Sequence, residues 1–156
     1  MGTHAYIGFE KADHTIEASY VHWDGYPQHI APLLLNFYNT TEKVQELVEL
    51  GGLSTLHEKV APDPDKPHSF EAPQENVTVA YHRDRQEPWE INKPNLYTSR
   101  KDFLDASKTA FFYLWSNNQW LLYVGQDFVE LTESGSAQRK APLKAKVIPF
   151  RKPALQ

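Results

Sequence analysis

The sequence has no cysteine, and this absence excludes several kinds of protein. A chain without thiols has no disulfide scaffold, no cysteine-ligated zinc or iron–sulfur cluster and no thiol nucleophile. Glycine is also scarce, with seven residues in 156, of which only Gly51 and Gly52 are adjacent. The glycine-rich phosphate loops of nucleotide-binding folds and the nucleophile elbow of hydrolases are therefore missing. We expect no cofactor.

Long apolar runs are missing as well. No stretch of 18 apolar residues occurs, so we expect no transmembrane helix and no membrane partner. The first residues, MGTHAYIGFEKAD, do not follow the basic and then apolar plan of a secretory signal. Together with the absence of cysteine, these features favour a cytoplasmic location.

Basic residues are few in most of the chain. Residues 1–131 hold 10 basic and 19 acidic residues, a net charge of −9, whereas residues 132–156 hold six basic and one acidic, a net charge of +5. We predict a single globular domain at 1–131 and a basic C-terminal tail at 132–156, which docks on the acidic domain as an edge strand at 143–148. The alternative is a free arm that binds nucleic acid, which the acidic domain itself is unsuited to do.

Aromatic residues are plentiful, with 4 Trp, 8 Tyr and 8 Phe. Because aromatic side chains bury large areas, they offset a modest number of aliphatic residues. We expect Trp23, Trp120, Leu34 and Phe37 in one core.

Alternating and helical periodicities predict the order β-β-α-α-β-α-β-β-β. The short connector 11–14 predicts an antiparallel hairpin, and Asn117-Asn118 predicts a second one within 110–124. A strand is expected at 77–84, after an irregular loop at 61–76. Thr41 and then Ser99 or Thr98 are expected to cap helices. The fold class predicted is α+β, with a mainly antiparallel sheet and helices packed mainly on one face.

The stretch at 20–38 joins a strand to a helix and reads YVHWDGYPQHIAPLLLNFY. Asp24-Gly25 is a strong turn pair, and Asp24 is also suited to cap the helix that follows. Proline lacks an N–H and is tolerated only near the first turn of a helix. The position of Pro32 therefore predicts that this helix begins near residues 29–31.

The motif HWDGYP in this stretch resembles an uncharacterised family of small proteins from tailed phages and prophages. The likeness extends to Tyr6-Ile7-Gly8, to the segments 51–56 and 80–85, and to Trp120 in an aromatic hairpin. The chain departs from the family at Ala31-Pro32, where Gly-Arg is usual, and at His82, where Gly is usual. The resemblance implies an accessory protein of a phage or mobile genetic element, acting in the host bacterial cytoplasm. It implies no particular chemistry.

Two His-x-Asp pairs stand at the ends of predicted strands. Residues i and i+2 of a strand point to the same side, so these pairs would converge if the strands are neighbours. Flanking arginines could then hold an anion. The candidate binding site consists of His22, Asp24, Tyr26, Arg83, Asp84 and Arg85. A weaker alternative is a metal site of His22, Asp24, His82 and Asp84. The purely structural interpretation is that residues 22–24 form the corner between a strand and a helix and that Asp84 forms an ion pair with an arginine.

Two functions remain open on this basis. The first is a phage accessory protein that binds a macromolecular partner, a host or phage protein, for instance as an inhibitor of a bacterial defence nuclease. The second is a small enzyme that uses a metal or acts on phosphate esters, or a nucleotide binder, with the His/Asp/Arg cluster as its site. We favour binding over catalysis, and nothing in the pattern predicts the oligomeric state.

Overall fold

The structure, a computed structural model of the whole chain, describes residues 2–133. The predicted basic tail and its edge strand at 143–148 lie outside the described residues. The prediction that they dock on the domain therefore stays a prediction.

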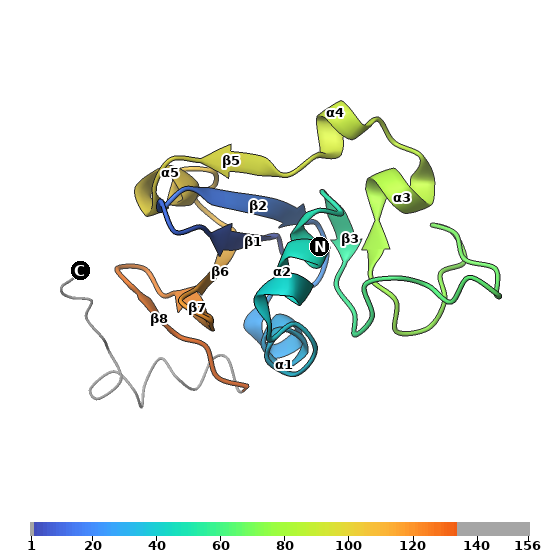
Figure 1. Cartoon of the computed structure of the whole chain (residues 1–156), viewed down its shortest axis with the longest axis horizontal. Helices are drawn as coiled ribbons and strands as arrows, with labels where there is room; N and C mark the ends of the chain where they lie inside the picture. Colours follow the sequence, from blue (N-terminus) through green and yellow to red (C-terminus); the bar gives the residue numbers. More distant parts are fainter. Residues whose placement is uncertain (1, 134–156) are drawn as a thin grey trace.

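Eight strands form one sheet in the order β4-β3-β2-β1-β6-β7-β8, and β5 pairs separately with β2 (Figure 1). The strands are β1 Ala5–Glu10, β2 Ile16–Val21, β3 Leu53–Thr55, β4 Val79–Ala80, β5 Asn95–Tyr97, β6 Phe111–Ser116, β7 Gln119–Tyr123 and β8 Phe128–Glu130.

Five helices accompany the sheet in the part of the chain that the structure describes. They are α1 Pro27–Phe37, α2 Thr41–Val48, α3 Tyr81–Arg85, α4 Trp89–Asn92 and α5 Arg100–Leu104. Within residues 2–133, none of the helices is both long enough and apolar enough to cross a bilayer.

The predicted α+β class is confirmed, but the sheet is mixed. Five strand pairs are antiparallel, whereas β1 with β6 and β2 with β3 are parallel. The predicted order omitted β3, α3, α4 and β5. Strands of three residues, such as Leu53–Thr55, are too short to show an alternation. The β2-α1-α2-β3 connection makes its two strands parallel because the helices carry the chain back across the sheet.

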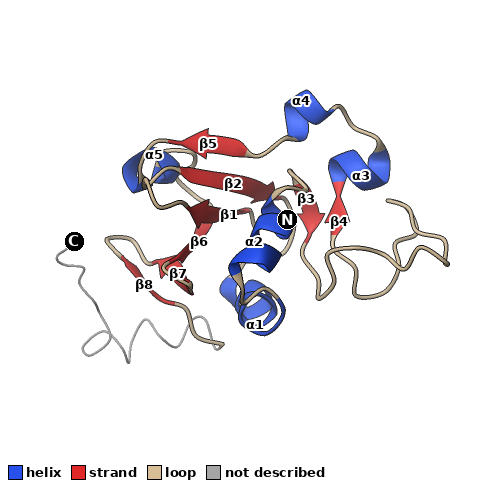
Figure 2. Ribbon diagram, viewed as in Figure 1, coloured by secondary structure: helices blue, strands red, loops and turns tan. Residues whose placement is uncertain are grey.

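Both faces of the sheet are covered, which corrects the prediction that helices pack mainly on one face. On one face α1 and α2 pack through Ile30, Leu34 and Val44 against the sheet residues Ile7 and Tyr113. On the other face α5 inserts Phe103 among Ile16, Ala18 and Leu114. Figure 2 shows α1 and α2 below the sheet and α5 beside its opposite face. A Cβ at Gly8 would lie 3.1 Å from the Phe103 ring, so glycine makes room for it.

The two predicted hairpins are confirmed. β1 and β2 pair antiparallel from Ala5↔Val21 to Glu10↔Ile16. β6 and β7 pair from Tyr113↔Leu122 to Ser116↔Gln119, across Asn117 and Asn118, which both adopt positive φ angles of 51° and 61°. Asparagine tolerates this left-handed conformation better than most residues, which explains why it occupies the turn.

Helix α1 begins two residues or more before the predicted start. Pro27 occupies its first turn, where a missing N–H costs nothing, and Pro32 lies inside the helix. Ile30, Leu34 and the C-cap residue Tyr38 are buried, but Phe37, which was expected in the core, is 43% exposed and is not a core residue. Thr40, not Thr41, caps α2 by accepting the Lys43 N–H, and Ser99 caps α5 as predicted.

The two tryptophans expected in the core differ in burial. Trp120 is 2% exposed, and its indole N–H donates to the Tyr38 carbonyl at 2.8 Å. Trp23 is 42% exposed, so its predicted burial is wrong. Its ring lies edge-on to His22 at 4.6 Å and against Gly2. The strand ends at Val21, so Trp23 lies in the turn that follows it and not on a covered face of the sheet.

We predict that Trp120→Ala lowers the free energy of unfolding by about 3–5 kcal/mol, because it leaves a cavity and removes a buried hydrogen bond. Trp23→Ala should cost less than half as much, since much of its ring already meets water. Urea denaturation of both variants measures the two values. Equal losses would contradict the difference in burial.

Candidate functional site

His82 and Asp84, which were predicted to lie at the end of a strand, are part of a helix. β4 is limited to Val79–Ala80, and α3 continues directly from it as Tyr81–Arg85. The Asp84 carboxylate accepts the Ala80 N–H at 2.8 Å, a contact between residues i and i+4 that bends the chain out of the strand. Because α3 is helical, His82 and Asp84 do not share a side as residues of one strand would.

Arg83 and Asp84 form a buried ion pair, as the purely structural interpretation predicted. Arg83 Nε and Nη2 donate to Asp84 Oδ1 and Oδ2 at 2.8 and 2.9 Å, and the Asp84 side chain is 2% exposed. The other guanidinium donors bind the carbonyls of Val60 and Thr78. Both Asp84 oxygens and most of the Arg83 N–H donors are thus engaged within the protein.

His68 attaches the 61–76 loop to this ion pair. Its Nδ1 accepts the Gln74 N–H at 3.0 Å, so the ring proton sits on Nε2, which lies 3.1 Å from Asp84 Oδ1. The angle at Nε2 does not meet hydrogen-bond geometry, so the contact is chiefly electrostatic. The loop that looked irregular in sequence is therefore anchored at a buried side chain.

The pKa of Asp84 lies below its usual value. Burial by itself raises that pKa, but the hydrogen bonds from Arg83 and the Ala80 N–H, the Arg83 charge and His68 outweigh it.

His22 belongs to a hydrogen-bonded chain with His4 and Tyr20. His4 Nδ1 lies 2.9 Å from the His22 carbonyl and 2.9 Å from the Tyr20 hydroxyl, which lies 3.0 Å from His22 Nδ1. Tyr20 donates to His22 Nδ1, and the single His4 Nδ1–H donates to the His22 carbonyl with the Tyr20 oxygen as its second acceptor. Burial and the neighbouring His4 lower the pKa of His22, which favours its neutral form. Its Nε2 then carries a proton.

Asp24 and Tyr26 belong to the turn before α1. Asp24 has a φ of 58°, and Gly25 donates its N–H to Thr3 while its carbonyl accepts from the buried Tyr113 hydroxyl, both at 2.8 Å. The N-cap of α1 is Tyr26, without a side-chain cap, so the predicted capping by Asp24 is wrong. Tyr26 is 37% exposed and its ring is 6.2 Å from that of His29. Neither Asp24 nor Tyr26 lines the pocket described next.

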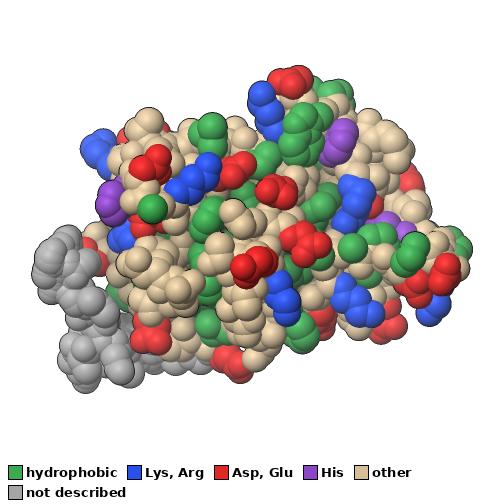
Figure 3. Space-filling view, viewed as in Figure 1, with side chains coloured by type: hydrophobic (Ala, Val, Ile, Leu, Met, Phe, Trp, Pro, Cys, Tyr) green, Lys and Arg blue, Asp and Glu red, His purple; other side chains and the backbone are tan. Residues whose placement is uncertain are grey.

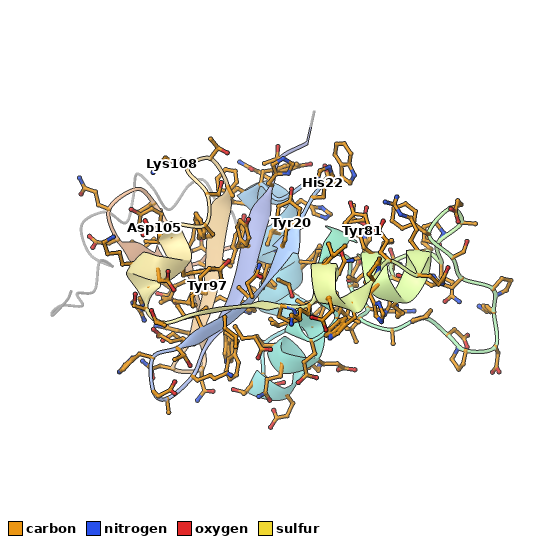
Figure 4. All side chains as sticks on the ribbon, turned by 90° about the horizontal axis from the view of Figure 1, so that it is seen from above. Tyr20, His22, Tyr81, Tyr97, Asp105 and Lys108 are labelled. Atoms are coloured by element: carbon orange, nitrogen blue, oxygen red, sulfur yellow. The ribbon has the colours of Figure 1, made fainter. Side chains whose placement is uncertain are left out.

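Two of the predicted residues, His22 and Arg85, line one pocket of about 460 Å³. It lies where the outer edge of β2 changes partners: β5 pairs with Ile16–Ala18, and β3 pairs at Val21. In Figure 4, Tyr20 lies on β2, His22 lies just beyond the end of this strand, and Tyr81 lies across from them on α3. The lining consists of Tyr20, His22, Gly52, Tyr81, Arg85, Glu87, Ile91, Asn92, Lys93 and Asn95.

Arg85 is held rigidly at this pocket. Its guanidinium carbon lies 4.4 Å from the centre of the Phe70 ring and 5.2 Å from that of Tyr81, and its Nε donates to Glu87 at 2.6 Å. Such stacking on aromatic rings stabilises a guanidinium and fixes its plane. Phe70, expected to pin the 61–76 loop, does so through this contact.

The metal alternative is not supported by the geometry. Within residues 2–133, no three His, Asp or Glu side chains are arranged to hold a metal ion, so His22, Asp24, His82 and Asp84 do not form such a site. His82 instead contacts the Glu87 carbonyl at 2.7 Å and the Trp89 ring at 5.0 Å.

Four of the ten residues that line the pocket come from α4, its C-cap residue and β5, which sequence periodicity missed. Their lining residues Ile91, Asn92, Lys93 and Asn95 lie in a segment without alternation. One signal was present in the adjacent pair Gly51-Gly52. A Cβ at Gly51 would lie 2.3 Å from the Asn92 carbonyl, and the Gly52 N–H donates to that carbonyl at 2.7 Å. The C-terminal end of α4 thus packs against Gly51 and Gly52.

No family model, no curated protein and no solved structure matches this chain.

We predict that Asp84→Asn lowers the free energy of unfolding by about 3 kcal/mol at neutral pH, near the lower end for breaking a buried ion pair. The reason is that Arg83 loses its charged partner while its side chain is only 26% exposed. Asp105→Asn, at a carboxylate that is 63% exposed, is the matched control and should change little. Chemical denaturation measures both.

Asp84→Asn should also change how the free energy of unfolding depends on pH under acidic conditions. Because the folded-state pKa of Asp84 is lowered, its contribution is complete above the unfolded pKa of about 3.9 and is lost as the pH falls through the folded value. The stability difference between the wild type and Asp84→Asn should therefore shrink below about pH 4. A difference that stays constant through this range would contradict the assignment.

Proposed function

We propose that this protein is an accessory protein of a phage or mobile genetic element that binds a macromolecular partner in the host cytoplasm. The partner class that fits best is a protein, and a bacterial defence nuclease, inhibited by the binding, is the specific case we favour. The observation that carries this proposal is a set of three exposed apolar side chains, one that lines the pocket and two that follow lining residues in the sequence.

Trp23, Ile91 and Leu96 form this group, which we call the rim. They are 42%, 77% and 70% exposed. Ile91 lines the pocket, and Trp23 and Leu96 directly follow the lining residues His22 and Asn95. In Figure 3, hydrophobic side chains gather at the surface over α4, at the top of the view. Exposed apolar groups beside a cleft are typical of protein interaction sites, where aromatic and large aliphatic side chains act as anchors.

The charge of the domain favours a protein partner of basic character. Residues 1–131 carry a net charge of −9, which repels nucleic acid. A nuclease presents a basic surface to its own substrate, and an acidic domain complements such a surface and speeds association with it. The resemblance of HWDGYP to phage proteins agrees with an anti-defence role, which remains our proposal.

The proposal is tested by capture from host bacterial cells with tagged wild type, Trp23→Ser and Leu96→Asp. Loss of an interface anchor typically costs more than about 1.4 kcal/mol, so each rim variant should retain about a tenth of the captured partner or less. Phe37→Asp is the matched control, since Phe37 is 43% exposed but lies on α1, beneath the sheet in Figure 1. It should capture as the wild type does.

The identity of the partner is then checked by mass spectrometry and by a cleavage assay with added wild-type protein. Equal capture by the rim variants, or equal loss with Phe37→Asp, would refute binding through the rim. Capture of a partner with no nuclease activity would refute the nuclease role alone.

A further inference from the structure

The pocket beside the rim has the dimensions and the fixed walls of a small-molecule site. Its volume of about 460 Å³ lies in the usual range of ligand pockets, about 300–1,000 Å³. Two tyrosine rings face it. The Tyr20 ring is held by contacts of its hydroxyl with His4 and His22, and Tyr81 packs on Phe70 at 5.6 Å. These contacts exist before any ligand arrives, so the ordering cost of binding is reduced.

The floor of the pocket stays open because residue 52 is glycine. A Cβ at this position would lie 3.2 Å from Asn92 Oδ1 and 3.7 Å from the Tyr81 ring. Tyr20 and Tyr81 both line the pocket, and a planar ring stacks favourably on aromatic faces. Asn92 and Asn95 supply amide groups that can pair with polar ring edges.

One part of the lining is cationic. Arg85 and Lys93 carry positive charge and Glu87 carries the single negative charge in the lining. Glu87 contacts Arg85 through Nε and Nη2, so the N–H donors of Nη1 are left for a ligand. Lys93 pairs with Glu90 at 2.9 Å, and these side chains are 50% and 79% exposed. Such an exposed pair is weak, and a phosphate can replace the carboxylate. His22 Nε2, which has no hydrogen bond within residues 2–133, is a further donor.

We propose that this pocket binds a nucleotide, with the base between Tyr20 and Tyr81 and the phosphate at Arg85, Lys93 and His22. The combination of aromatic rings and cationic donors selects a ligand that has both a flat ring and an anion. The inference does not rest on the proposed function, because it concerns the pocket itself and not Trp23 or Leu96.

Calorimetric titration of the full chain with the four common nucleoside 5′-monophosphates tests this proposal. Adenosine, which has a base but no phosphate, and inorganic phosphate, which has no base, are titrated separately. We expect at least one nucleotide to bind more tightly than either half. Arg85→Ala and Lys93→Ala should each weaken that affinity by about tenfold, the loss expected for one charge-assisted hydrogen bond.

Lys101→Ala is the matched control for Lys93→Ala. Lys101 also lies in an exposed intrahelical ion pair, with Asp105 at 3.3 Å, but does not line this pocket. It should bind the nucleotide as the wild type does. Gly52→Ala, which adds one methyl group at the floor, should weaken binding without removing a charge. Its melting temperature without ligand shows whether the variant is folded.

Several results would overturn the proposal. They are no binding by any of the four nucleotides, equal affinity for phosphate alone or for adenosine alone, and an equal loss in Lys101→Ala. If a short peptide with aspartate and tryptophan binds the pocket and the nucleotides do not, the pocket belongs to a protein partner instead.

Discussion

The buried carboxylate of Asp84 organises the half of the molecule that carries the pocket. It neutralises Arg83, accepts the Ala80 N–H and lies against His68. These contacts end β4, start α3 and attach the 61–76 loop. The positions of Tyr81 and Arg85 follow, because both lie on the short helix that Asp84 stabilises. A buried ion pair of this kind contributes less to net stability than to holding one specific arrangement.

The second constraint is the divided outer edge of β2. β5 covers residues 16–18 of this strand and β3 joins at Val21, so the edge near Tyr20 faces the pocket in place of a third strand. Ordinary sheets close such an edge with a longer strand or a covering helix. Here α4, which packs against Gly51 and Gly52, forms the opposite wall of the pocket. The pocket thus results from two short strands, β5 and β3, that pair with different parts of β2.

The surface around this pocket joins two kinds of chemistry. The rim residues Trp23, Ile91 and Leu96 are apolar and exposed, whereas Arg85 and Lys93 bring positive charge into a domain that is acidic overall. A local cationic spot on an acidic domain is suited to small anions, since the overall field keeps long polyanions away. This contrast is the physical reason why a protein partner and a nucleotide are both compatible with one region.

Local patterns in the sequence determined the elements whose partners are close along the chain. The hairpins at 5–21 and 111–123, the caps near Thr40 and Ser99 and the burial of Leu34 and Trp120 follow from alternation, turn residues and helical spacing. Of the candidate site, the sequence identified His22 and Arg85, whereas the Gly51-Gly52 pair was the one signal of α4 and β5 left none. Only the tertiary structure decided that 81–85 is helical, that Trp23 lies outside and that Asp84 is internal. Each of these depends on contacts between residues far apart in the chain, such as His68 with Asp84, and no local periodicity records them.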